Sequence, residues 1–131
     1  MDTSNIIEMI KTFKNCHSLE NLTDISNWDI SKVVTIREIF YGCISLKEVS
    51  ISKWKPSSLK DCTSVFRGCI KLKDIESIIY ILKNVKNFDR MIENCFQINS
   101  NEIKSHLDKS KKEEENSEKI NRAKKKRPKE V

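Results

Sequence analysis

The chain has 131 residues, enough for one small domain, with 37% hydrophobic and 34% charged residues. This composition excludes a membrane-spanning protein, since no stretch approaches the roughly 18 uninterrupted apolar residues of a spanning helix. The formal net charge is +6, and residues 104–131 hold 11 Lys/Arg against 6 Asp/Glu, so the preceding residues are close to neutral. The first residues show neither the basic nor the apolar region of a secretory signal, so we expect an intracellular location with reduced thiols.

A repeat of 26 residues fills positions 6–98. Its clearest marks are four cysteines, of which the last three are spaced by 26 residues and the first lies 27 residues ahead of the second: Cys16, Cys43, Cys69 and Cys95. Apolar residues recur at fixed distances on both sides of each cysteine. A unit this short cannot bury its own apolar face, so the repeat predicts that neighbouring units share one continuous core, as in a solenoid.

The second unit illustrates the local structure that we predict. Five apolar residues from Val33 to Cys43 follow the spacing of one face of a short helix. Val49 and Ile51 then alternate with polar residues, which indicates a half-buried strand, and a turn follows around Trp54. The predicted fold class is therefore an α/β repeat.

The amino-acid sequence of these units also resembles that of a known family. Residues 24–33 read Asp-Ile-Ser-Asn-Trp-Asp-Ile-Ser-Lys-Val. With the pattern from Val33 to Trp54, this is similar to the BspA-like leucine-rich repeat, also called the mycoplasma lipoprotein repeat. The resemblance implies a short leucine-rich-repeat-like solenoid of about four 26-residue units. It also implies a protein-binding role without a catalytic site, in a family usually found at the cell surface or secreted.

The last unit departs from the repeat. Apolar residues from Ile75 to Cys95, with Phe88 near them, fit one long helical stripe, and Asp74 can cap its start. Because a terminal unit must close the open end of the core, we predict a largely helical C-terminal cap at about 74–96. The solenoid as a whole is assigned to residues 1–103.

The cysteines are interpreted as buried structural thiols. Cys62, the fifth cysteine, occupies the unit position that Ile36 and Phe88 fill elsewhere, which is typical of a core position. No Cys-x-x-Cys pair typical of zinc sites is present, although disulfides and a metal site stay open as alternatives. We assign no catalytic residue, metal or cofactor, and interpret His17 and His106 as surface residues.

Partner-binding residues are predicted on the outward strand positions and at the two tryptophans. Leucine-rich-repeat modules usually bind through their strand face, which is an argument by analogy. The tryptophans are interpreted mainly as a column that closes the core, with partner contact as the alternative. The predicted residues are Ser26, Asn27, Trp28, Ser50, Ser52, Lys53 and Trp54.

Residues 104–131 are predicted to form a basic, flexible tail, disordered or weakly helical, because their charged runs bury too little apolar surface to fold. One run resembles a nuclear-import signal and would also suit nucleic acid: Lys124, Lys125, Lys126, Arg127 and Lys129. The alternative is a solvated tail, since Glu113–Glu115 would weaken phosphate binding and no aromatic side chain is available to contact bases.

Our main hypothesis is a non-catalytic protein–protein interaction module with a protein partner of unknown identity. We expect no membrane insertion, and a monomer or a weak dimer. One alternative is a nuclear or nucleic-acid-associated protein that acts through its basic tail. Another is a fragment of a larger surface adhesin.

Overall fold

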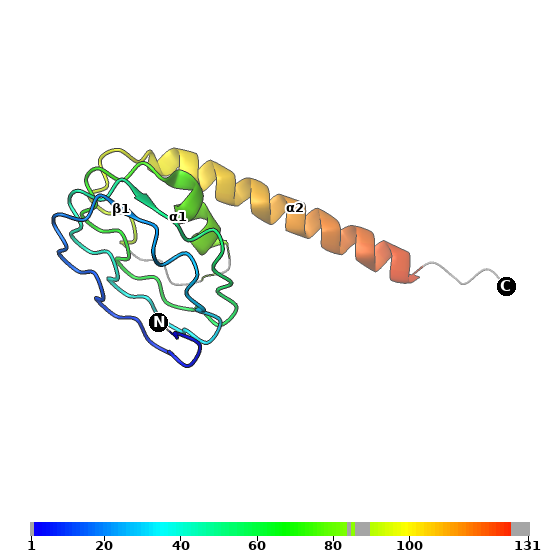
Figure 1. Cartoon of the computed structure of the whole chain (residues 1–131). Helices are drawn as coiled ribbons and strands as arrows, with labels where there is room; N and C mark the ends of the chain where they lie inside the picture. Colours follow the sequence, from blue (N-terminus) through cyan, green and yellow to red (C-terminus); the bar gives the residue numbers. More distant parts are fainter. Residues whose placement is uncertain (1, 84, 86–89, 127–131) are drawn as a thin grey trace.

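The computed structural model describes residues 2–83, 85 and 90–126. Within these residues it contains two helices, α1 (Ile75–Leu82) and α2 (Ser100–Lys126). It also contains one parallel pair of two-residue strands, β1 (Asn21–Leu22) and β2 (Glu48–Val49). Figure 1 shows a body of segments that run side by side, with α2 extending away from it.

Segments 26 residues apart in the sequence are neighbours in the body. We call residues 6–16, 33–43, 59–69 and 90–95 the ladder segments. Each of the first three donates main-chain N–H groups to the carbonyls of the next at repeat-equivalent positions. Three bonds of 2.8, 3.0 and 2.9 Å show this: Phe13 N–H to Ile39 O, Phe40 N–H to Val65 O and Phe66 N–H to Met91 O. Main-chain hydrogen bonds therefore join each repeat to the equivalent positions of the next.

The helix that we predicted over residues 33–43 is wrong. Alternate N–H groups of this segment donate to the next ladder segment, and others close short turns, such as Cys43 N–H to Phe40 O at 3.1 Å. Two positions in each repeat also have positive φ, which a right-handed helix does not allow. One position is filled by Lys11, Glu38, Ser64 and Arg90, and the other by Asn15, Gly42, Gly68 and Asn94. The apolar spacing marks the inside of a chain of turns, not a helix face.

The predicted leucine-rich-repeat-like solenoid is wrong for the same reason. Helix–strand units do not recur within the described residues: the sheet is limited to the pairs Asn21–Glu48 and Leu22–Val49, and both helices follow residue 74. The chain forms a small α/β fold instead.

The C-terminal cap is only partly helical. Asp74 caps α1 as predicted, since its carboxylate accepts the N–H of Ser77 at 3.1 Å. The helix ends at Leu82, however, and residues 90–95 belong to the last ladder segment, where Glu93 O accepts the N–H of Gly68 at 2.8 Å. These cross-segment bonds exclude one helix over 74–96. Phe88, which we placed near the helical stripe, lies outside the described residues.

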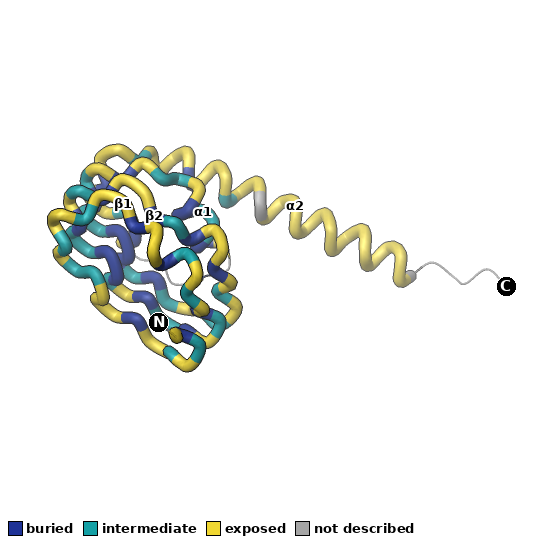
Figure 2. The backbone as a smooth tube through the Cα atoms, in the orientation of Figure 1, coloured by how far each residue is buried: buried dark blue, intermediate teal, exposed yellow. Residues whose placement is uncertain are grey.

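The predicted disorder is wrong for residues 104–126, because they belong to α2, a continuous helix of 27 residues. It crosses the boundary that we placed between residues 103 and 104. Ile103 is buried against the core and Leu107 packs beside it, whereas the described side chains from 108 onwards are exposed (Figure 2). Acidic and basic residues four apart, such as Glu115 with Lys119 and Glu118 with Arg122, favour this helix without any core contact.

The core lies between the ladder segments and α1. Its aromatic column is formed by Phe13, Phe40 and Phe66, whose ring centroids are 5.7 and 5.4 Å apart with nearly parallel planes. In Figure 2 the buried residues run along the inner sides of the segments. Stacking of these rings therefore joins the first three ladder segments.

A candidate protein-binding face

The two tryptophans occupy equivalent sequence positions but different environments. Trp54 is buried, and its indole N–H donates to Ile25 O at 2.8 Å. Trp28 is only half-buried, and its ring packs on Phe13 with centroids 5.8 Å apart and an 18° interplanar angle. Its indole N–H has no hydrogen-bond partner among the described residues. Trp28 is thus a fixed aromatic ring with a free donor at the surface.

Trp28 lies in a shallow depression of about 420 Å³ between two repeat-equivalent loops. We call this depression the Trp28 face. Its lining residues come from positions 26–31 and from the loop that begins after β2: Ser26, Asn27, Trp28, Asp29, Ile30, Ser31, Lys53 and Lys55. Two ammonium groups and one carboxylate give this surface a net positive charge at neutral pH.

Local hydrogen bonds hold the loop around Asp29 in place. The Ser31 hydroxyl and N–H donate to the Asp29 carboxylate at 2.6 and 2.9 Å, and these bonds hold the pKa of Asp29 below its ordinary value. The Thr3 hydroxyl accepts the Asp29 N–H at 2.7 Å and donates to Asp29 O at 3.0 Å. The loop of the Trp28 face is therefore ordered without a partner, which reduces the conformational entropy lost on binding.

Only part of the predicted binding set meets on this face. Ser26, Asn27, Trp28 and Lys53 line it. Ser50 instead donates its N–H to Leu22 O, Ser52 is exposed outside the lining, and Trp54 is in the core. These last three do not join the Trp28 face.

Sequence reasoning missed Asp29, Ser31 and Lys55. A signal for the first two was present, because the pattern Asp-x-Ser or Asp-x-Thr occurs at positions 2–4, 24–26, 29–31, 61–63 and 108–110. At 2–4, 29–31 and 61–63 the carboxylate accepts from the N–H and the hydroxyl two residues later. Such a recurring motif indicates an ordered turn.

The cysteines are buried thiols, as the repeat pattern predicted, apart from half-buried Cys16. Three of the thiols donate to carbonyls of the preceding ladder segment, at 3.0, 3.1 and 2.9 Å: Cys43 to Phe13 O, Cys69 to Phe40 O and Cys95 to Phe66 O. Burial raises the pKa of Cys43 and Cys95 to about 11 and of Cys62 to about 12, and it raises that of Cys69 as well. In the part of the chain that the structure describes, no group of three His, Cys, Asp or Glu residues is arranged to hold a metal.

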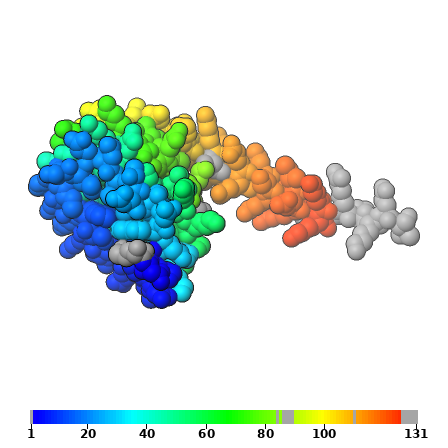
Figure 3. Space-filling view, viewed as in Figure 1, coloured from blue at the N-terminus to red at the C-terminus, as the bar shows by residue number. Residues whose placement is uncertain are grey.

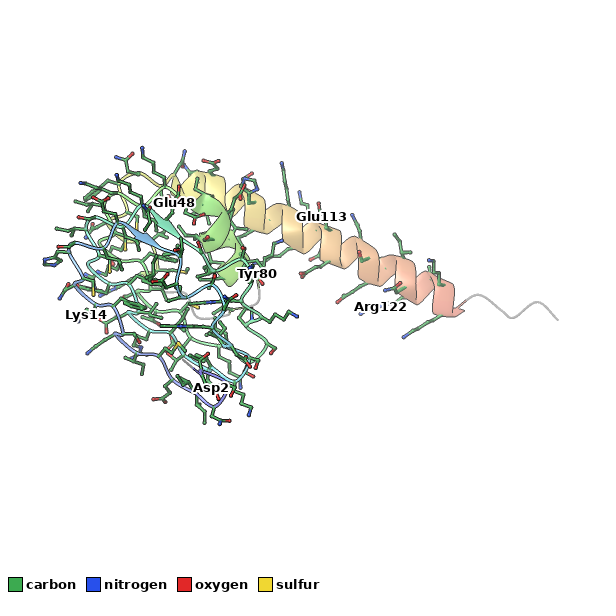
Figure 4. All side chains as sticks on the ribbon, viewed as in Figure 1. Asp2, Lys14, Glu48, Tyr80, Glu113 and Arg122 are labelled. Atoms are coloured by element: carbon green, nitrogen blue, oxygen red, sulfur yellow. The ribbon has the colours of Figure 1, made fainter. Side chains whose placement is uncertain are left out.

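The basic run lies at the far end of α2. Lys124 and Lys125 are exposed there, and Lys126 is the last residue of the helix. Arg127 and Lys129 lie outside the described residues. Figure 4 shows Arg122 and Glu113 on the part of α2 that runs clear of the body.

A family model described as "Mycoplasma protein of unknown function, DUF285" matches residues 1–126. The chain belongs to this family. The DUF285 family is related to the BspA-like repeat proteins, so the sequence resemblance is confirmed at that level. No curated protein and no solved structure matches the chain. None of the described helices combines the length and the apolar content needed to cross a bilayer.

Proposed function

We propose that this chain is a protein-binding module that acts by binding rather than by catalysis, and that its partner contacts the Trp28 face. The observation that carries the proposal is the contrast between the two tryptophans. Trp54 is buried and its indole N–H is bonded within the core, whereas Trp28 is only half-buried and its indole N–H has no partner among the described residues. A large, rigid aromatic side chain with a free polar atom is typical of residues that dominate interface energies.

The charges around Trp28 indicate the chemistry of the partner. Lys53 and Lys55 line the depression, and the only carboxylate lining it among the described residues, Asp29, already accepts two bonds from Ser31. The lysines are therefore available to an incoming carboxylate, and the Trp28 N–H to a carbonyl or carboxylate oxygen. An acidic loop or peptide segment of another protein satisfies both requirements.

Binding to an acidic peptide tests this proposal without knowledge of the natural partner. A peptide library that varies in Asp and Glu content is screened against the full chain, and affinities are measured by calorimetry. We expect Trp28→Ala to weaken binding of the selected peptides by about tenfold or more, as for an aromatic hot spot. Phe96→Ala, which removes a 75% exposed ring outside the Trp28 face, serves as the matched control. Equal binding by Trp28→Ala, with the fold intact, would refute the proposed site.

The end of α2 favours a second candidate function, which is binding of a polyanion. Four described cations are exposed within two helical turns, away from the body: Lys119, Arg122, Lys124 and Lys125. Exchanging all four for Gln should weaken retention on heparin and flatten the salt dependence of binding, because fewer counterions are released. Unchanged retention of this variant would exclude the candidate.

A further inference from the structure

The first ladder segment has an open main-chain edge. In the interior ladder segments, alternate carbonyls accept N–H groups from the preceding segment, as Ile39 O accepts from Phe13. The equivalent carbonyls of the first ladder segment accept no hydrogen bond from any described residue; they belong to Glu8, Ile10, Thr12 and Lys14. The N-terminal residues, blue in Figure 3, form an outer face of the body, and Ile10 is 43% exposed. This edge presents a row of unused acceptors.

The last ladder segment has the complementary open edge. Phe66 and Gly68 donate their N–H groups to this segment, but its own equivalent N–H groups donate to no residue that the structure describes. These groups belong to Arg90, Ile92 and Asn94. Arg90 and Asn94 are exposed, and Phe96 beside them is 75% exposed. This edge therefore presents donors with the same two-residue spacing as the acceptors at the other end.

One charge pair across the two edges is complementary, Lys14 with Glu93, whereas Lys11 and Arg90, which share another repeat position, are both cationic. Lys14 and Glu93 occupy the same repeat position, two residues before the repeat cysteine. Within the molecule, neighbours in this column form an ion pair, since Arg67 Nη2 lies 3.5 Å from Glu93 Oε1. A first ladder segment placed against the last one of another copy would set Lys14 beside Glu93. Lys14 lies on the side of the body opposite α2 (Figure 4), where its ammonium group pairs with Glu38 at 3.1 Å and its side chain is 30% exposed.

We propose that a second copy of this chain docks head to tail, with the donor edge of one copy against the acceptor edge of the next. The expected bonds repeat the internal pattern: Arg90 N–H to Ile10 O, Ile92 N–H to Thr12 O, and Asn94 N–H to Lys14 O. The half-buried thiol of Cys16 then reaches Ile92 O, as the other repeat thiols reach the preceding segment. Two acceptor edges cannot make these bonds with each other, so the contact is heterologous and leaves one edge open at each end.

This contact goes beyond the proposed function, since it uses neither the depression at Trp28 nor the end of α2. Charge reversal on the full chain tests it. Lys14→Glu places two carboxylates at the contact and Glu93→Lys places two ammonium groups there, so each variant alone should associate at least about tenfold more weakly than the wild type. The matched controls are Lys109→Glu and Glu113→Lys, which make the same charge changes at exposed positions on α2.

Sedimentation equilibrium from micromolar to millimolar concentration gives the readout, and circular dichroism verifies that each variant is folded. We expect association of the wild type and both controls, loss of association in each single variant, and recovery in an equimolar mixture of Lys14→Glu with Glu93→Lys. A monomeric wild type at every concentration would overturn the proposal. Wild-type association by Glu93→Lys alone, or a mixture that stays monomeric, would also overturn it. Peptide binding at the Trp28 face is measured separately, so either proposal can fail alone.

Discussion

Replacing Gly68 or Gly42 with alanine tests the turn geometry of the ladder segments. Both glycines have positive φ, +70° at Gly42 and +76° at Gly68, in the equivalent positions. A Cβ at residue 68 would lie 3.6 Å from the Cα of Gly42, which is ordinary contact, whereas a Cβ at residue 42 would lie 2.2 Å from Oδ1 of Asn15. The two substitutions therefore share a backbone cost and differ in one contact.

We expect Gly68→Ala to lower the free energy of unfolding by about 1 kcal/mol, the cost of the left-handed region for a residue with a Cβ. Gly42→Ala should lose about 2 kcal/mol, because the Asn15 side chain must also leave its rotamer. Gly68→Asn should lose less than Gly68→Ala, since Asn fills the same φ region at residues 15 and 94. Urea unfolding followed by circular dichroism measures these differences.

The added variant Asn15→Gly separates the two costs. In its presence Gly42→Ala should lose only the backbone contribution of about 1 kcal/mol, because the clashing side chain is absent. If Gly68→Ala is neutral, or if the loss at residue 42 is the same with and without Asn15, the turn geometry described here is incorrect.

Three further predictions follow from burial. At pH 8 the native protein should react with iodoacetamide at Cys16 well before Cys43 or Cys95, and equal labelling of all thiols, measured by mass spectrometry, would contradict this. The free energy of unfolding should also fall as the pH rises from 9 to about 11, because the pKa of Cys43 and Cys95 is higher in the folded state and the unfolded thiols therefore ionise first. Ile103→Ala should lower the free energy of unfolding by about 2–4 kcal/mol in urea and release α2 from the body. The control Ile120→Ala, at a 55% exposed position, should change it by less than about 0.5 kcal/mol. A similar loss in both variants would show that Ile103 does not hold α2 against the core. Trp54→Phe should cost about 1–3 kcal/mol through the unpaired Ile25 carbonyl, unlike Trp28→Phe, whose unfolding midpoint should match the wild type.

The sequence predicted the register of the fold better than its local structure. The spacing of Cys43, Cys69 and Cys95 correctly indicated equivalent buried positions, because burial constrains residue type. The spacing from Val33 to Cys43 did not distinguish a helix from a chain of turns, since both bring residues three or four apart to one side. Glycine and asparagine at one position of each repeat indicate a positive φ there. The second positive-φ position has no such indication, because its residues share no chemical property: Lys11, Glu38, Ser64 and Arg90.

The remaining errors have similar physical causes. The charged run of α2 contains the four-residue spacing of opposite charges that stabilises a helix, but we weighed only its lack of apolar residues. In the Trp28 face, the tryptophan was identified by its type, whereas Lys55 gives no signal until the fold sets its loop beside residues 26–31. Trp28 and Trp54 have different environments because of where each lies in the fold. The same residue type at equivalent repeat positions does not reveal this difference.

The most direct test of the side-by-side ladder segments is NMR detection of scalar couplings across hydrogen bonds in the labelled full chain. The structure predicts a coupling from the Phe40 amide nitrogen to the Val65 carbonyl carbon, and one from Phe13 to Ile39. Couplings from Phe40 to Ile36 and from Cys43 to Ile39, as in a helix over residues 33–43, would contradict the account.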